Sequence, residues 1–220
     1  MTEFEKYVKS DFGVSTETLY DYKSSMTPMV IEEREMRAVS MSVFDRLMME
    51  RIIWCAGPVN DRMSIIVQAQ LMFLDSLGVE DITLHVDTPG GSVKSGLGIV
   101  DVMDYIKCDI ATVNTGMAAS MGSILLGAGT KGKRSSLRFS KTMLHQSSGG
   151  AVGNIQDARI SMKEWEKTND ILFELLGEYC DKDPKQVMED STRDKWLTAS
   201  EALDYGIIDE VITKKLVTES

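Results

Sequence analysis

A serine set among small residues, Ala118-Ala119-Ser120-Met121-Gly122, is the first feature of this 220-residue chain that could do chemistry. The residues before it, 110–113, are typical of a β-strand, and those after it, 124–126, have helical character. At a strand-to-helix junction the serine Oγ can stand clear of the backbone, with N–H groups beside it that stabilise an anion. The pattern is A-x-S-x-G and not the G-x-S-x-G of a nucleophile elbow. Close helix–strand packing explains the small residues equally well, so both interpretations stay open.

The chain holds two histidines, His85 and His145, that could serve a serine nucleophile as general base. His145 ends an apolar strand and precedes a glycine-rich turn, so its ring could reach an open site while the strand fixes its backbone. His85 alternates with apolar neighbours inside a strand, which favours a structural role on one face of a sheet. His145 is therefore the candidate base, although a hydrogen-bonded structural histidine fits the same pattern.

A catalytic triad also needs a carboxylate that orients the imidazole and stabilises the imidazolium. With 34 acidic residues, composition cannot select one. Asp194 is the candidate because it lies in a polar loop beside Trp196 and Leu197, which can anchor the loop. The alternative is a surface carboxylate paired with Arg193 or Lys195.

An oxyanion needs N–H donors that no side chain obstructs. Pro89-Gly90-Gly91 follows a predicted strand and offers such N–H groups, although an ordinary tight turn has the same composition.

Strand and helix signals alternate in short units along the chain, which indicates an α/β protein with mostly parallel strands. We expect a helix capped by Ser42 and a capping box from Thr198 to Glu201. The expected strands cover residues 52–55, 81–86, 110–113, 137–139, 142–144 and 207–212, and the expected helices cover 43–49, 60–77, 94–106, 153–180 and 184–189.

The helix predicted over 153–180 carries a stripe whose positions alternate three and four residues apart and are apolar except Asn169. At 1.5 Å per residue this helix is about 40 Å long, comparable with the diameter of the domain. The stripe could line the core of its own subunit, or it could pair with the same helix of a second subunit. We favour the second interpretation.

The net charge of −10, with no basic tract, makes binding to nucleic acid or to anionic lipid unexpected. Three widely spaced cysteines suit neither a disulfide framework nor a zinc site. The sequence also lacks a recognisable signal peptide or membrane span, and we expect a cytoplasmic protein. Residues 1–25 have the composition of a leader or propeptide-like arm, and 26–220 that of a single domain.

Four motifs together resemble the proteolytic subunits of the Clp protease family. The similarity extends in order from about Met26 to the last of these motifs, which makes it far more specific than any one motif. The motifs are VDTPGGSV (86–93), NTGMAASMGSILLGAGTKGKR (114–134), TMLHQSSGG (142–150) and STRDKWLTASEALDYGIID (191–209).

The resemblance implies a serine endopeptidase. Ser120 is then the nucleophile, His145 the general base and Asp194 the residue that orients it. The backbone N–H groups of Gly91 and Met121 form the oxyanion hole. It implies no metal and no cofactor in this chain, since ATP is used by the partner unfoldase.

The resemblance further implies the ClpP/crotonase-like fold, a superhelical head of repeated β-β-α units with a protruding long-helix handle over about 147–180. The expected assembly is a homo-oligomer of two stacked heptameric rings. An AAA+ unfoldase hexamer of the ClpX, ClpA or ClpC type delivers unfolded proteins, and peptides are also substrates. Residues 26–40 would form the axial pore entrance.

Some positions depart from the family pattern. Thr192 replaces an acidic residue that pairs across the rings, and Ser147-Ser148 replaces a Pro-Leu pair after the histidine. Thr83 and His85 replace aromatic residues of the unfoldase docking pocket. Altered ring stacking, handle geometry and docking are the corresponding expectations.

Two other functions are compatible with parts of this sequence. A crotonase-like enzyme acting on acyl-CoA thioesters shares the fold and a glycine-rich oxyanion hole, but it would use carboxylates and not a Ser/His pair. A non-catalytic ring subunit would have lost its triad, whereas all three residues are present here.

Overall fold

A computed structural model describes residues 29–34, 37–150 and 153–213. The chain divides at Glu50/Arg51 into two compact units, and each is described by itself. The predicted arm over 1–25 lies outside the described residues.

The first unit contains a hairpin and one short helix. β1 (Met29–Arg34) pairs with β2 (Arg37–Ser42) in antiparallel register, and α3 (Val43–Met49) follows directly. The Ser42 side chain accepts a hydrogen bond from the Asp45 N–H, and the Asp45 carboxylate accepts one from the Ser42 N–H. The predicted Ser42 cap is confirmed, as one half of a capping box.

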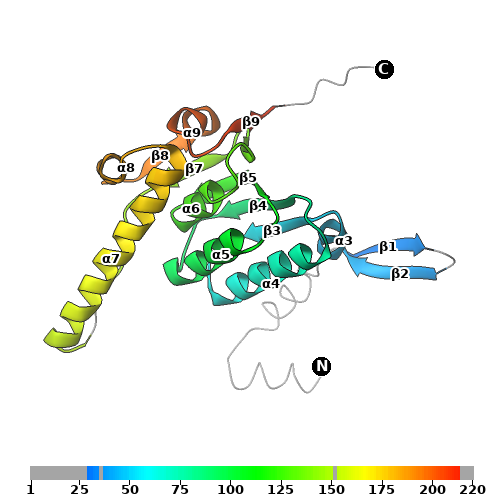
Figure 1. Cartoon of the computed structure of the whole chain (residues 1–220), viewed down its shortest axis with the longest axis horizontal. Coiled ribbons are helices and arrows are strands. Elements are labelled where there is room, and N and C mark those ends of the chain that lie inside the picture. Colours follow the sequence, from blue (N-terminus) through cyan, green and yellow to red (C-terminus); the bar gives the residue numbers. More distant parts are fainter. Residues whose placement is uncertain (1–28, 35–36, 151–152, 214–220) are drawn as a thin grey trace, which may run out of the picture. The chain divides into compact units, whose positions relative to one another are not determined.

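The second unit is built on a mostly parallel sheet, as predicted (Figure 1). β3, β4, β5, β6 and β9 lie side by side in parallel, β7 pairs in parallel with the end of β5, and β8 pairs antiparallel with β7. These strands are β3 (Ile52–Ala56), β4 (Ile82–Thr88), β5 (Ile110–Ala119), β6 (Arg134–Leu137), β7 (Lys141–Leu144), β8 (Lys195–Thr198) and β9 (Glu210–Ile212).

Three helices lie on one face of this sheet: α4 (Asp61–Leu77), α5 (Val93–Tyr105) and α6 (Met121–Gly127) (Figure 1). Alternate strand residues such as Ile53 and Leu84 are buried, as expected for a period of two. The intervening strand residues point to the other face of the sheet. There His85 stacks on Trp54 with ring centroids 4.6 Å apart. Burial lowers the pKa of His85. Its place inside β4, on one face of the sheet, is the one that its alternation predicted.

β5 is longer than the predicted strand 110–113. Its first half pairs with β6, and its second half pairs with β7 through Ala118 and its neighbours. The strand bends where the β4–β5 register shifts, and there the Met117 N–H donates to the Asp87 carboxylate at 3.0 Å. Pairing with β7 therefore extends β5 through residues that have no apolar alternation. The C-terminal end of β5 positions Ser120.

The strand predicted at 137–139 is wrong by about three residues, since β6 runs from Arg134 to Leu137. The prediction followed apolar residues, whereas most of β6 is polar and buried. Arg134 is only 3% exposed, and it donates to both oxygens of Asp209 and to the carbonyls of Tyr179 and Gly206. Satisfied hydrogen bonds here replace apolar packing.

α7 (Ile155–Cys180), α8 (Pro184–Asp190) and α9 (Ala199–Tyr205) complete the unit, and the predicted Thr198–Glu201 capping box is present. The C-terminal part of α7 is buried through Phe173, Leu176 and Cys180, while its N-terminal part projects from the sheet with Ile155 and Ile160 exposed. Figure 1 shows this projection. Of the stripe itself, Leu176 is buried in the core of its own subunit, whereas Ile155 and Met162 are exposed. The pairing of the stripe with a second subunit stays a prediction.

Asp209→Asn is expected to lower the free energy of unfolding at pH 7 by about 3 kcal/mol, because it leaves the Arg134 charge buried without its partner. Burial alone raises the pKa of Asp209, but the hydrogen bonds and charge of Arg134 outweigh burial and hold this pKa below its ordinary value. The interaction between Arg134 and Asp209 therefore stabilises the fold at pH values above the unfolded-state pKa of Asp209. This stabilisation is lost as the pH falls through the lower pKa that Asp209 has in the folded state.

Denaturant titrations of the wild type and Asp209→Asn should differ most near neutral pH and converge below about pH 4. Glu210→Gln, which changes an exposed neighbouring carboxylate, is the control and should have little effect. A stability difference independent of pH would contradict the assignment.

Candidate active site

Ser120 sits at the junction between β5 and α6 with φ 55° and ψ −121°, a conformation that side chains rarely adopt. Its N–H donates to the Met143 carbonyl at 2.9 Å, and its carbonyl accepts from both the N–H and the hydroxyl of Ser123. The predicted strand-to-helix junction is confirmed, and its backbone has the strained form of a nucleophile elbow.

Two glycines allow the β4–α5 turn to approach this junction. A Cβ on Gly90 would lie 2.6 Å from the Ala119 carbonyl oxygen and 2.7 Å from the Ser120 Cβ. A Cβ on Gly122 would lie 2.7 Å from the Thr88 methyl group. The small residues therefore allow close packing, and this packing also holds Ser120 in place. Close packing and a serine that stands clear of the backbone are thus two consequences of the same arrangement.

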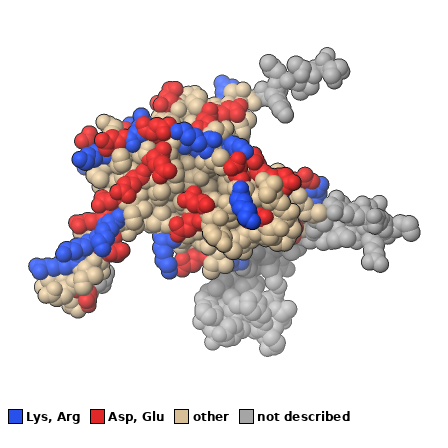
Figure 2. Space-filling model, in the orientation of Figure 1, with Lys and Arg blue, Asp and Glu red and all other residues tan. Residues whose placement is uncertain are grey.

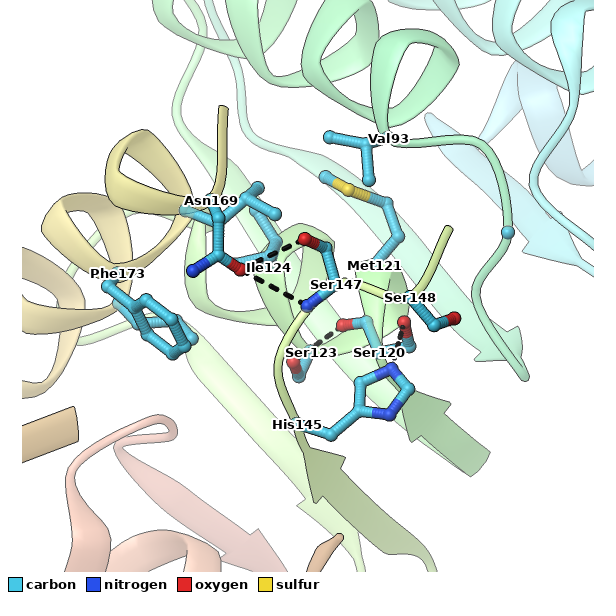
Figure 3. A pocket seen from close by; sticks show the side chains of 13 residues that line it. Val93, Ser120, Met121, Ser123, Ile124, His145, Ser147, Ser148, Asn169 and Phe173 are labelled. Carbon is cyan, nitrogen blue, oxygen red and sulfur yellow. Dashed lines mark hydrogen bonds between the residues drawn. The ribbon is translucent and has the colours of Figure 1, made fainter. Parts of the chain in front are cut away.

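His145 directly follows β7 and points its ring at Ser120 (Figure 3). The distance from His145 Nε2 to Ser120 Oγ is 2.7 Å, and His145 Nδ1 lies 3.4 Å from Asp194 Oδ1. Because β7 and β8 are antiparallel with Leu144 opposite Lys195, their register places residue 145 opposite residue 194. The structure thus brings the three predicted triad residues together.

The surroundings of the triad differ in exposure. The His145 side chain is 24% exposed and that of Asp194 is 62% exposed. Asp194 faces the histidine, whereas Lys195 lies 3.8 Å from Asp190. The alternative pairing of Asp194 with Lys195 is therefore not the arrangement that the structure shows.

Gly91 and Met121 both line the pocket that contains Ser120. The bridge to Val59 uses the Gly90 carbonyl and the Ser92 N–H, each at 2.9 Å. Since pairing alternates along an extended chain, the Gly91 N–H points away from Val59, and Gly91 also lines the pocket. Met121 is the first residue of α6, so its N–H has no acceptor within the helix.

A pocket with both polar and apolar lining residues opens beside Ser120 and His145, with one wall formed by α7 (Figure 3). The residues that line it are Gly91, Val93, Ser120, Met121, Ser123, Ile124, His145, Ser147, Ser148, Asn169, Leu172, Phe173 and Leu176.

The contribution of α7 to the pocket was missed by sequence reasoning, which considered this helix only as core or interface. The available signal was Asn169, the polar position within an apolar stripe. Among the residues that the structure describes, no cluster of three or more His, Cys, Asp or Glu side chains is arranged to hold a metal ion.

Comparison with known proteins identifies the family. The family model described as "Clp protease" matches residues 33–215. The chain belongs to the Clp protease family. The ATP-dependent Clp protease proteolytic subunit of Porphyromonas gingivalis is 45% identical over 219 residues, covering 97% of this chain and 99% of the relative. Proteins of the same name from Bacteroides fragilis and Bacteroides thetaiotaomicron are each 43% identical over 220 residues, covering 98% of this chain and 100% of each relative.

Membership in the Clp protease family confirms the predicted family, the α/β fold class and the function of a protease subunit.

Ser120→Gly is expected to be more stable than Ser120→Ala by about 1 kcal/mol, because glycine adopts positive φ without strain while alanine keeps it. Both variants lack the hydroxyl, so the comparison isolates the backbone. Thermal and denaturant unfolding of the two variants measures the difference. A glycine variant less stable than the alanine variant by about 0.5–1 kcal/mol, which is the cost of glycine's greater freedom in the unfolded chain, would mean that the elbow stores no strain.

Proposed function

We propose that the chain is a serine endopeptidase subunit in which Ser120, His145 and Asp194 form the catalytic triad. Ser120 Oγ attacks the peptide carbonyl while His145 Nε2 accepts its proton. The Asp194 carboxylate accepts a hydrogen bond from the His145 Nδ1–H and so holds the imidazole in place. The N–H groups of Gly91 and Met121 donate to the oxyanion of the tetrahedral intermediate.

The second half of the reaction uses the same groups. His145 gives its proton to the leaving amine, the C–N bond breaks, and an acyl ester forms on Ser120. Water then attacks this ester with His145 as base, which releases the acid and restores the hydroxyl. The 2.7 Å contact between Ser120 Oγ and His145 Nε2, at a strained junction, is the observation that carries this proposal.

The finer points of assembly belong to the same proposal. The exposed apolar residues on the projecting part of α7, Ile155, Ile160 and Met162, suit contact between two stacked heptameric rings. We infer that an AAA+ unfoldase hexamer feeds unfolded proteins to these rings, and that ATP is used by the unfoldase, so this chain needs no cofactor or metal. The predicted pore entrance at 26–40 and a cytoplasmic location remain part of this proposal.

The charge distribution supports peptide substrates and not nucleic acid. Figure 2 shows acidic and basic side chains interspersed over the visible face, and the net charge is −10. In the described part of the chain, no helix has the length and apolar character needed to cross a bilayer.

Hydrolysis of a fluorogenic peptide tests the role of Ser120. Ser120→Ala should lower kcat by about 10⁶-fold, whereas Ser76→Ala, an exposed serine on α4, should leave it unchanged. With an AAA+ unfoldase and ATP, the wild type should also degrade a stably folded tagged protein, and omission of ATP should stop this but not peptide cleavage.

Each alternative function predicts a different result. Turnover of an acyl-CoA thioester that survives Ser120→Ala would favour the crotonase-like enzyme. Wild-type protein that forms rings but cleaves no peptide, with or without the unfoldase, would favour a non-catalytic subunit.

A further inference from the structure

The chain that follows His145 is tied to α7 by three polar side chains. Ser147 donates to Asn169 Oδ1 twice, from its N–H at 3.2 Å and from its hydroxyl at 2.9 Å (Figure 3). The Trp165 Nε1–H donates to the Ser147 Oγ at 2.7 Å. We call Ser147, Trp165 and Asn169 the α7 clasp.

The chemistry of the donors fixes the direction of every hydrogen bond in the clasp. A backbone N–H and an indole N–H can only donate. The atom of Asn169 that faces the Ser147 N–H must therefore be oxygen, and the Ser147 hydroxyl must accept from Trp165 and donate to Asn169. Each group has one compatible role, so the clasp specifies a single arrangement.

The clasp completes a set of anchors on both sides of the catalytic histidine. Before His145, the Met143 carbonyl accepts from the Ser120 N–H at 2.9 Å. After it, the Gln146 N–H donates to the Ser191 carbonyl at 3.2 Å, and Ser147 is held by the clasp. A Cβ on Gly149 would lie 3.3 Å from the Trp165 ring, so the chain continues over this ring.

The position of the clasp argues for more than local stability. Residues 145–150 have no regular secondary structure, and no ladder fixes their path. Asn169 and Trp165 lie one turn apart on α7 and are partly buried, and Asn169 replaces an apolar residue in the stripe. Ser147 and Asn169 line the pocket together with Ser120 and His145.

On the basis of the proposed function, we propose that the α7 clasp positions the general base. Ser147, Trp165 and Asn169 are positioning residues that act through the backbone of residues 145–147 to keep the His145 ring within reach of Ser120. A shift of about 1 Å in a catalytic group can lower a rate by about 10²-fold. The clasp therefore makes the rate depend on where α7 lies.

Variants of Asn169 separate this role from general stability. Asn169→Leu has similar size but no acceptor, and kcat for a short peptide should fall by about 10- to 100-fold with KM within about 3-fold. Asn169→Asp keeps an acceptor for both Ser147 donors and should restore kcat to within about 5-fold of wild type. Thr168→Ala, which removes a local bond to Glu164 on the same helix, is the control and should not change kcat.

Two further variants test the hydrogen bonds one at a time. Trp165→Phe and Ser147→Ala should each lower kcat by less than Asn169→Leu, since each leaves the bond from the Ser147 N–H intact. The double variant Ser147→Ala/Asn169→Leu should be no slower than Asn169→Leu alone, because both changes break one network.

Hydrogen exchange of the Ser147 amide provides a readout that does not need activity. Exchange should be faster in Asn169→Leu than in wild type and in Asn169→Asp.

An unchanged kcat in Asn169→Leu, a rise in KM alone, or an Asp variant as slow as the Leu variant would overturn the proposal. A wild type that protects this amide but cleaves no peptide would instead refute the proposed function, and unprotected Ser147 in wild type would refute the clasp itself.

Discussion

The positive φ of Ser120 is the constraint on which the rest of the site depends. A conformation of this kind persists only where the surroundings hold it, at a cost of about 1–3 kcal/mol. Here the Met143 carbonyl, the Ser123 side chain and the close approach of Gly90 supply that support. The result is a hydroxyl that stands clear of the sheet, with the Met121 N–H beside it.

The sheet then brings His145 and Asp194 to this hydroxyl. β7 begins only after β6 has left β5, so it pairs with the end of β5 that carries Ser120. β8 returns antiparallel to β7, which sets Asp194 opposite His145. Residues 74 positions apart in the chain, 194 − 120, thus meet through ladder register, and α7 closes the pocket from the other side.

Much of this could be predicted because the relevant signals are local. Ser42 and the Thr198–Glu201 pair indicate caps, and the position of His145 after an apolar strand indicates a ring that can reach an open site. Other features depend on partners far away in the chain. Arg134 can be buried in a strand because Asp209 accepts its hydrogen bonds, and Asn169 can lie in an apolar stripe because it accepts hydrogen bonds from Ser147. Apolar periodicity alone assigns such buried polar residues wrongly.

The most direct test of the account is covalent labelling of the purified chain with a fluorophosphonate, followed by intact-mass and peptide mapping. The reagent reacts with a serine whose hydroxyl is activated by a base, so it reports the contact between Ser120 and His145 rather than the fold. The account predicts one adduct per chain, mapped to Ser120 and absent from Ser120→Ala and His145→Ala. An unlabelled wild type, with and without an AAA+ unfoldase, or an adduct on another serine would contradict it.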